Sequence, residues 1–458
     1  MTRQRKILLI NPDWRGIRRQ KQPQFKRIWQ PLDLAIAAAL LEKDGFSVKI
    51  LDNNIDRLSP QAVGRLSGDF DKVFVTSTPY DRWQCPSLDI EFFFNTIRNI
   101  PRRRLYIMGA HVTERTRAIL RKSRARAAIL NEPERTIHEI ACRDLRTNIP
   151  PDIPGIAYLR EERLVRSSPR GYPDDLDQSP YPAYHLLDMD QYRYELMGEN
   201  FAIMEGSRGC PYRCSFCYLG MYGTGYRQKS PERLLDEISY VKRRFHTKNI
   251  YFMDLEFGLN RNFLLSFCSG LIERKIGISW CCQTRVTDVD EDALRCMREA
   301  GCNLIHFGVE AGSDRVLRQT GKGIKVDDCA RAIAITHEAG IRTALFLNFG
   351  FPDETVDDMD STIGLAVRLN PTLASFHLIV PFPGTRLAKE IGLDPEAFPP
   401  HLYPHFNFVY HDLKTLKRML RKAYLRFYLR PSYLKGLIGS RMRPGLEQGR
   451  LLLRLFTG

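Results

Sequence analysis

The chain has 458 residues, of which 43% are hydrophobic and 27% charged, a balance typical of a globular protein with two or three domains. No stretch approaches the roughly 18 apolar residues of a membrane span, and the 11 cysteines form no regular framework, so we expect neither a span nor disulfides. The formal net charge of +16 is compatible with binding to nucleic acid, to an anionic membrane or to an anionic substrate. It can equally be a general excess of basic residues on the surface without a partner.

Residues 5–145 alternate between strand and helix patterns. Strands are expected at 6–11, 47–52, 72–78, 104–110 and 127–130, and helices at 32–46, 59–66, 88–98 and 131–145. The apolar run after Lys6 is too short for a signal peptide and predicts the first buried strand. This alternation predicts an α/β domain over 1–145, a Rossmann-like parallel sheet with helices on both faces. No G-x-G-x-x-G follows the first strand, which disfavours a dinucleotide cofactor.

Residues 146–200 are rich in proline and polar residues and predict a linker on the surface. Six further strand candidates then alternate with helices over residues 201–395, beginning near 201, 250, 278, 304, 343 and 375. Six such units predict a partial (β/α)6 barrel, whose active site should lie at the carboxyl ends of its strands. Residues 396–458 form a basic, helical C-terminal segment.

Three cysteines, Cys210, Cys214 and Cys217, stand in the loop "GCPYRCSFCYLG" after the first barrel strand. A structural zinc ion prefers four protein ligands, and the next cysteine, Cys268, has no nearby cysteine partner. Three thiolates can instead hold three corners of a [4Fe-4S] cluster and leave one iron open. The spacing of the cysteines by itself therefore does not decide between a zinc ion and an iron–sulfur cluster.

The strand ends that follow carry "DLEFG" at 254–258, "QTR" at 283–285, "GVEAGSD" at 308–314 and "NFGFPDET" at 348–355. With the Cys-x-x-x-Cys-x-aromatic-Cys loop, in which Phe216 is the aromatic residue, this order resembles the radical S-adenosylmethionine (SAM) superfamily. The α/β domain, "GAHVT", "NEPERTIHEI" and "DLDQSPYPAYHLL" resemble its cobalamin-binding branch, the class B methyltransferases. The resemblance covers about residues 5–395.

The resemblance implies three cofactors: a [4Fe-4S] cluster on the three cysteines, S-adenosyl-L-methionine and cobalamin. Acidic residues would meet the amino group and sulfonium, Arg285 the carboxylate, and polar residues the ribose. The residues expected to bind SAM are Phe216, Asp254, Glu256, Arg285, Glu310 and Ser313. Those expected along the cobalamin tail are Ser77, Thr78, Gly109, His111 and Thr113.

Two loops bear on cobalamin. The loop at 11–16, "NPDWRG", lacks the Asp-x-His-x-x-Gly motif of many cobalamin enzymes, so cobalt is expected without a protein imidazole beneath it, as in the methyltransferases that this chain resembles. The second loop departs from the family pattern. The family has two glycines in the loop where this chain has Gly109 and Ala110.

The resemblance implies an enzyme that transfers a methyl group to an unactivated carbon through a 5′-deoxyadenosyl radical and methylcobalamin. The alternative is an oxidative cyclase or ring-rearranging enzyme like the anaerobic magnesium-protoporphyrin ester cyclase. A methylthiotransferase would need further cluster cysteines near the N-terminus, where only Cys85 and Cys142 occur. A non-catalytic, cluster-bearing sensor is the remaining class.

The expected partners are a small-molecule substrate, hydrophobic or lipid-like, and an electron donor such as flavodoxin or ferredoxin, with no nucleic acid.

The C-terminal segment allows two interpretations. Leu413, Leu416, Leu420, Tyr424 and Phe427 recur at helical intervals with basic residues largely on the other faces, and Pro431 ends the helix. This apolar stripe either packs across the open side of the barrel or lies on an anionic bilayer. We expect a cytoplasmic protein, with a peripheral position at the inner membrane face as the second possibility.

Overall fold

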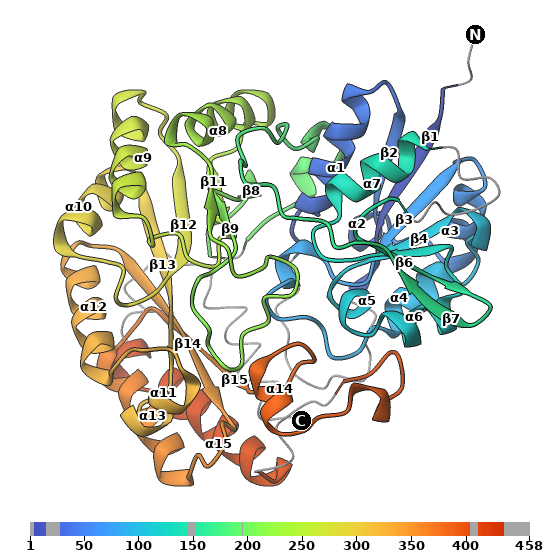
Figure 1. Ribbon diagram of the computed structural model, residues 1–458. Coiled ribbons are helices and arrows are strands. Elements are labelled where there is room, and N and C mark those ends of the chain that lie inside the picture. The colour runs from blue at the N-terminus through green and yellow to red at the C-terminus, as the bar shows by residue number, and fades with distance from the viewer. Residues whose placement is uncertain (1–3, 15–27, 144–151, 195, 404–410, 435–458) are drawn as a thin grey trace.

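The first strand, β1 (Lys6–Asn11), is an apolar run buried on both faces, and it lies inside a parallel sheet as the sequence predicts. The computed structural model describes residues 4–14, 28–143, 152–194, 196–403 and 411–434. Two α/β units make up this part of the chain (Figure 1). The α/β fold class predicted from the sequence is confirmed.

The N-terminal sheet has seven strands in the order β2-β1-β3-β4-β5-β6-β7. Its remaining strands are β2 (Ser47–Asp52), β3 (Lys72–Thr76), β4 (Leu105–Met108), β5 (Ala127–Ile129), β6 (Ile156–Arg160) and β7 (Arg163–Arg166). Its helices are α1 (Leu32–Lys43), α2 (Asn53–Asp56), α3 (Pro60–Ser67), α4 (Glu91–Ile97), α5 (Ala110–Glu114), α6 (Thr116–Ser123) and α7 (Glu134–Cys142). Separate apolar cores on the two faces of the sheet explain why its strands are apolar throughout.

Strands β6 and β7 lie within residues 146–200, where the sequence predicts a surface linker and no strand. They form an antiparallel hairpin that extends the sheet beyond β5. Glu161 and Glu162 make its two-residue turn, both with positive φ (49° and 63°), the backbone that favours asparagine and glycine. Because neither residue is a usual turn former, the hairpin carried no recognisable signal.

The second unit is an open six-stranded parallel sheet in the order β15-β14-β13-β12-β11-β8, which confirms the six predicted strand–helix units. Its strands are β8 (Phe201–Met204), β11 (Asn249–Phe252), β12 (Ser279–Thr284), β13 (Cys302–Glu310), β14 (Arg342–Phe349) and β15 (Leu373–Leu378). Its helices are α8 (Pro231–Phe245), α9 (Arg261–Glu273), α10 (Glu291–Glu299), α11 (Asp314–Thr320), α12 (Val326–Glu338), α13 (Val356–Leu369) and α14 (Arg386–Glu390).

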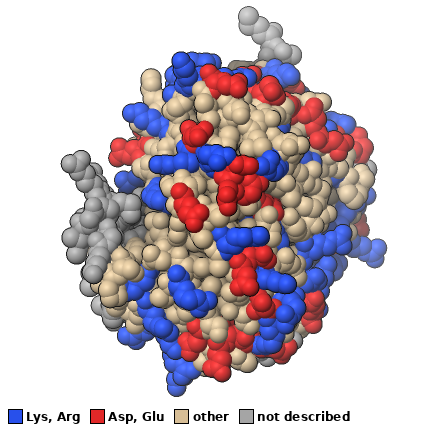
Figure 2. Space-filling view, turned by 90° about the vertical axis from the view of Figure 1, so that its left-hand side faces the viewer, with Lys and Arg blue, Asp and Glu red and all other residues tan. Residues whose placement is uncertain are grey.

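The surface over these helices carries both signs of charge. Lysine, arginine, aspartate and glutamate side chains are interspersed across the barrel side of the molecule (Figure 2). Exposed arginines gather instead in the N-terminal unit between α4 and β5, where Arg98, Arg102, Arg103 and Arg124 lie on the surface. The net charge of +16 is therefore not gathered over the barrel helices.

The C-terminal helix α15 (Leu413–Tyr428) packs along β15 and against α13. Its buried residues include Leu416, Met419 and Phe427, so the apolar stripe lies against the barrel rather than on a surface open to a bilayer. The hydroxyl of Tyr424 hydrogen-bonds the backbone N and O of Phe376, at 3.3 and 3.1 Å, and Tyr428 does the same at Ala374. A second basic, leucine-containing run, "LEQGRLLLRLF" at 446–456, is also expected from the sequence and lies outside the described residues.

Within the described ranges, no helix is both long and apolar enough to cross a membrane.

A buried cluster of charges joins the two units. Arg208, which follows β8, donates to Glu205 at 2.9 Å, to Glu132 at 3.0 Å and to Glu134 at 2.7 Å. Glu132 comes from the loop after β5 and Glu134 from the first turn of α7, both in the N-terminal unit. Arg227 also donates to Glu132, at 2.5 Å. All five side chains are buried.

Burial affects the two ends of this cluster differently. Burial alone would raise the pKa of Glu205, but Arg208 and Lys229 outweigh it and hold that pKa below its ordinary value. Burial raises the pKa of Glu134, which Arg208 only partly offsets.

Replacing Arg208 with alanine should lower the free energy of unfolding by about 3–5 kcal/mol, because it leaves buried carboxylates without a counter-charge. Urea denaturation followed by tryptophan fluorescence measures the loss. The exposed Arg163 provides the matched control, and its alanine variant should stay within about 0.5 kcal/mol of the parent. Equal, small losses in both variants would contradict the structural role of the cluster.

Candidate functional site

The cysteine loop is closed at its base by a short hairpin. Strands β9 (Ser207–Arg208) and β10 (Arg227–Gln228) pair antiparallel, so residues 209–226 leave and return at one point. Gly209 has φ +83°, and a Cβ there would lie 2.0 Å from the carbonyl oxygen of Gly225. Only glycine therefore fits where the loop begins.

Two backbone hydrogen bonds hold the middle of the loop against the barrel. The N–H of Ser215 donates to the carbonyl oxygen of Thr320, and the N–H of Leu387 donates to that of Ser215, both at 2.8 Å. Phe216 packs edge-on against Phe351, with ring centroids 5.5 Å apart. The loop is thus fixed at the carboxyl ends of the strands, where the sequence places the active site.

The three cysteines are partly buried and lie close enough to affect one another's ionisation. Burial raises the pKa of Cys210 to about 11 and that of Cys217 well above its ordinary value, with Cys214 and Cys85 adding to the shift of Cys217. A metal centre that binds these sulfurs must therefore displace their protons.

Among the described residues, the trio of histidine, cysteine or acidic ligand atoms within 4.8 Å of one another is Asp44, His138 and Cys142. The sulfurs of Cys210, Cys214 and Cys217 therefore do not stand at the roughly 3.8 Å separations of a closed tetrahedral zinc site. Three thiolates in one loop can hold three irons of a [4Fe-4S] cluster.

Two acidic residues follow β11, and both are buried. Asp254 accepts hydrogen bonds from the backbone N–H of Gly206, at 2.9 Å, and from Ser207 Oγ, at 2.6 Å. Glu256 accepts from Thr284 Oγ1 and, at 2.7 Å, from the backbone N–H of Arg285. Burial raises the pKa of Asp254 to about 6 and that of Glu256 to about 8. Asp254 holds the turn that leads into the cysteine loop.

Arg285 and Glu310 meet through a lysine that the sequence analysis missed. Arg285 stacks on the ring of Tyr212, in the cysteine loop, at 3.7 Å, and its Nη2 donates to the carbonyl oxygen of Lys322. Lys322 Nζ lies 2.5 Å from Glu310 Oε1, and Asn348 donates to the other oxygen of Glu310. These side chains form one connected polar cluster beside the cysteine loop. We call this cluster, made of Tyr212, Arg285, Glu310, Lys322 and Asn348, the polar mouth.

The backbone of Glu310 is unusual, and Lys322 follows an unusual turn. Glu310 has φ +66°, a conformation that costs a residue with a side chain about 1–3 kcal/mol and clusters at functional sites. Lys322 lies between Gly321 and Gly323, both with positive φ, in "TGKGI". A lysine between two glycines was the signal available in the sequence. Ser313, at the N-cap of α11, makes no side-chain cap bond and is partly buried.

The N-terminal unit reaches this mouth through the loop after β3. Gln283, at the end of β12, donates to Gln84 at 3.0 Å. The neighbouring Cys85 is exposed, yet burial raises the pKa of its thiol to about 11, with Glu310 adding to the shift. Cys85 of the N-terminal unit therefore lies near Glu310 and Cys217 of the barrel.

The five residues predicted along the cobalamin tail lie together, at the carboxyl ends of β3 and β4 and on α5. Gly109 has φ +109°, and a Cβ there would lie 2.6 Å from Ser77 Oγ, so glycine lets these two strand ends approach. Thr113 Oγ1 accepts from the backbone N–H of Asn131, at 3.1 Å, and lies 3.8 Å from Met221 Sδ, beyond the cysteine loop.

His111 is fully buried, with both ring nitrogens in hydrogen bonds. Its Nε2 lies 2.7 Å from the carbonyl oxygen of Ser87, so this nitrogen carries the proton, and Nδ1 accepts from Thr78 Oγ1 at 2.8 Å. Burial lowers the pKa of His111 to about 3, which keeps the ring neutral. In this structure His111 positions the loops after β3 and β4, and its contact with a cofactor stays a prediction.

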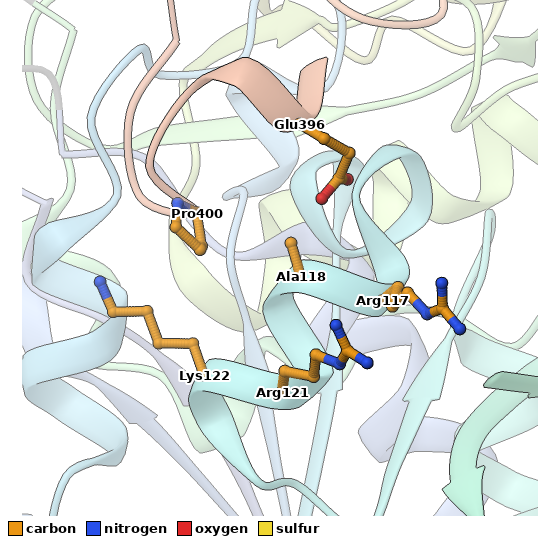
Figure 3. A pocket seen from close by; sticks show the side chains of 6 residues that line it. All are labelled: Arg117, Ala118, Arg121, Lys122, Glu396 and Pro400. Carbon is orange, nitrogen blue, oxygen red and sulfur yellow. The ribbon is translucent and has the colours of Figure 1, made fainter. Parts of the chain in front are cut away.

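A separate basic hollow of about 390 Å³ lies between α6 and the segment around residue 396 (Figure 3). The side chains of Arg117, Arg121 and Lys122 extend from α6, and Glu396 and Pro400 come from the opposite side. None of these residues belongs to the predicted site.

Comparison with known proteins agrees with this geometry. Residues 204–366 match the family model of the radical SAM superfamily. An uncharacterized methyltransferase of Pyrococcus horikoshii is 29% identical over 447 residues, which are 94% of each chain. The anaerobic magnesium-protoporphyrin IX monomethyl ester cyclase of Rubrivivax gelatinosus is 30% identical over 291 residues, 61% of this chain and 52% of the cyclase.

Two solved structures share the fold. The cobalamin-dependent SAM radical enzyme OxsB, with aqua-cobalamin and SAM bound, superposes with a TM-score of 0.76 at 15% identity, over 99% of this chain and 71% of that one. The radical SAM methyltransferase TsrM from Kitasatospora setae, with cobalamin and a [4Fe-4S] cluster bound, has a TM-score of 0.68 at 20% identity, over 85% and 74%.

The raised pKa of Glu256 predicts a pH-dependent cost of its burial. The protonated Glu256 side chain contributes fully to the free energy of unfolding below its ordinary pKa of 4.5. This contribution is lost as the pH rises through about 8, where the buried side chain ionises. Glutamine mimics the protonated side chain, so Glu256→Gln should gain stability over the parent progressively between these pH values. Denaturation midpoints measured across this range test it. The exposed Glu291, changed to glutamine, should show no such pH-dependent gain, and a flat difference for Glu256→Gln would contradict the prediction.

Proposed function

We propose that this chain, which belongs to the radical SAM superfamily and has the fold of its cobalamin-dependent members, transfers a methyl group to an unactivated carbon. The observation that carries the proposal is the placement of the three-cysteine loop. It lies at the carboxyl end of the first barrel strand and faces loops that leave the carboxyl ends of the N-terminal sheet. Ligands of both kinds of sheet bind at these ends, so two cofactors can meet between the units.

The residues present fit the three cofactors. When bound, the cluster and SAM would supply a 5′-deoxyadenosyl radical and cobalamin a transferable methyl group. Cys210, Cys214 and Cys217 would hold three irons. The substrate and the reactive faces of the cofactors would meet between the cysteine loop and the N-terminal loop that carries Cys85, where the surrounding protein would exclude water.

Within this arrangement, we assign SAM to Arg285 and Glu310 of the polar mouth and to the neighbouring Glu256. Arg285 is held by Tyr212 and by the Lys322 carbonyl, which orients its guanidinium for a carboxylate. Glu310, fixed by Lys322 and Asn348, would accept from the ribose hydroxyls, with Ser313 beside it. Both oxygens of Asp254 accept hydrogen bonds in the turn before the loop, whereas the bonds to Glu256 use its Oε1, so we assign the amino group to Oε2 of Glu256. A cationic amino group there would lower the raised pKa of Glu256, and Phe216 would line the same side.

In the N-terminal unit, Ser77, Thr78, Gly109 and Thr113 would border the cobalamin tail. His111 uses both nitrogens within the protein, so we infer that it does not ligate cobalt. This agrees with a lower cobalt face without imidazole, as the missing histidine of the loop at 11–16 implies.

Changing Cys210, Cys214 and Cys217 together to alanine should remove about four irons and four sulfides from anaerobically purified protein, because three thiolates hold the cluster. Iron and sulfide analysis and the brown absorbance report the loss. Cys296→Ala, a partly buried cysteine on α10 outside the loop, serves as the control and should keep its iron. Iron retained by the triple variant would refute the assignment.

Methyl transfer predicts two products derived from SAM. One SAM methylates cobalt and a second provides the radical, so S-adenosylhomocysteine and 5′-deoxyadenosine should accumulate together under reduction. Mass spectrometry of the reduced, cobalamin-loaded protein with SAM tests this. Binding of SAM without either product would instead indicate a sensor.

The similarity to the magnesium-protoporphyrin ester cyclases supports one alternative, an oxidative cyclisation or ring rearrangement. This chain spans about half of the R. gelatinosus cyclase, so the likeness does not extend to that whole protein. Formation of 5′-deoxyadenosine without S-adenosylhomocysteine would favour this alternative over methyl transfer.

The substrate and partners follow from the same site. We infer a small-molecule substrate and an electron donor of the flavodoxin or ferredoxin kind, and the hydrophobic or lipid-like character of the substrate stays a prediction from the sequence. Peripheral contact with an anionic membrane would have to use the exposed cations of α15, such as Lys414, Lys417 and Arg421, since the apolar stripe is packed. A nucleic-acid substrate is not part of the proposal.

A further inference from the structure

The ends of helices α1 and α7 bring three potential metal ligands together, away from the cysteine loop. His138 and Cys142 stand four residues apart and therefore share one face of α7, and Asp44 is the first residue after α1. Both helices end here, so the three side chains stand next to one another at the same end of the helix pair.

The distances between the donor atoms are close to those around a tetrahedral ion. Cys142 Sγ lies 3.7 Å from His138 Nε2 and 3.9 Å from Asp44 Oδ2, and His138 Nε2 lies 2.7 Å from Asp44 Oδ2. Zinc bound at its usual bond lengths would separate the sulfur from the other two atoms by about 3.6 Å and those two by about 3.3 Å. Only the histidine–aspartate contact must open, and by about 0.6 Å.

We propose that Asp44, His138 and Cys142 form a binding site for a borderline divalent metal ion of the Zn²⁺ type. One thiolate, one imidazole and one carboxylate suit such an ion better than Mg²⁺ or Ca²⁺, which prefer oxygen. Asp44 and Cys142 are exposed, so the fourth coordination position is open to water or to a donor from another molecule.

Two cations lie beside the site. Lys72 and Arg5 donate to the carbonyl oxygens of residues 140–143, at the end of α7, and both act to lower the pKa of the Cys142 thiol. Burial, with Asp44 adding to it, raises the pKa of the Cys142 thiol. Binding therefore releases one proton, as the S–H bond is replaced by a metal–sulfur bond, and it strengthens as the pH rises.

The position suggests what the ion would do. Helices α1 and α7 run side by side in the same direction, and their first turns carry Asp33 and Glu134, next to Arg208. An ion that joins the far ends of the two helices would fix their spacing. It would thereby support the end that contacts the barrel.

Alkylation of Cys142 tests the proposal without an activity assay. Full-length protein, loaded anaerobically with its cluster so that the loop cysteines are occupied, is treated with iodoacetamide with and without Zn²⁺. Peptide mass spectrometry then follows Cys142. Zn²⁺ should slow its alkylation about tenfold, because the bound thiolate is no longer a free nucleophile.

A matched pair of variants makes the result specific. His138→Ala should abolish the protection, whereas His185→Ala should keep it. His185 makes a comparable exposed contact, 3.1 Å from Glu42, without a thiol nearby. An alkylation rate that Zn²⁺ leaves unchanged in the parent protein, or full protection in His138→Ala, would overturn the proposal.

Discussion

The buried guanidinium of Arg208 is the constraint on which the arrangement of this protein depends. It stands directly before the cysteine loop and bonds Glu205 on its own side and two glutamates from the N-terminal unit. A buried charge of this kind is tolerated only when every partner is present, so the ion cluster forms only when the two units are correctly docked. The start of the loop is thereby tied to the position of the other domain.

Apolar packing also joins the N-terminal unit to the barrel, through more residues than the ion cluster. Trp29, Tyr80 and Trp83 of the N-terminal unit belong to the same continuous core as the barrel strands, and Tyr80 also donates to Glu205. The two units consequently behave as one body rather than as domains on a hinge. A site built from loops of both can then hold its groups at fixed separations, which suits chemistry on a reactive intermediate.

The sequence predicted what depends on local pattern. The strand–helix alternation located both sheets, and Ser230 caps α8 as its position before a proline indicates. The β6–β7 hairpin was missed because its turn uses two glutamates. Lys322, Tyr212 and Cys85 were missed because they reach the mouth from loops whose return path only tertiary structure defines. For Asp254 and His111 the residue type suggested ligand contact, whereas burial gives both of them bonds within the protein.

The tyrosines of α15 affect how the protein behaves among other chains. An open parallel sheet has a free edge at β15, where unpaired N–H and C=O groups would invite a strand from a neighbouring molecule. Tyr424 and Tyr428, one helical turn apart, bond both groups of Phe376 and of Ala374. The helix therefore occupies the place of a seventh strand without being one, and it closes at this edge the route by which sheets join into aggregates.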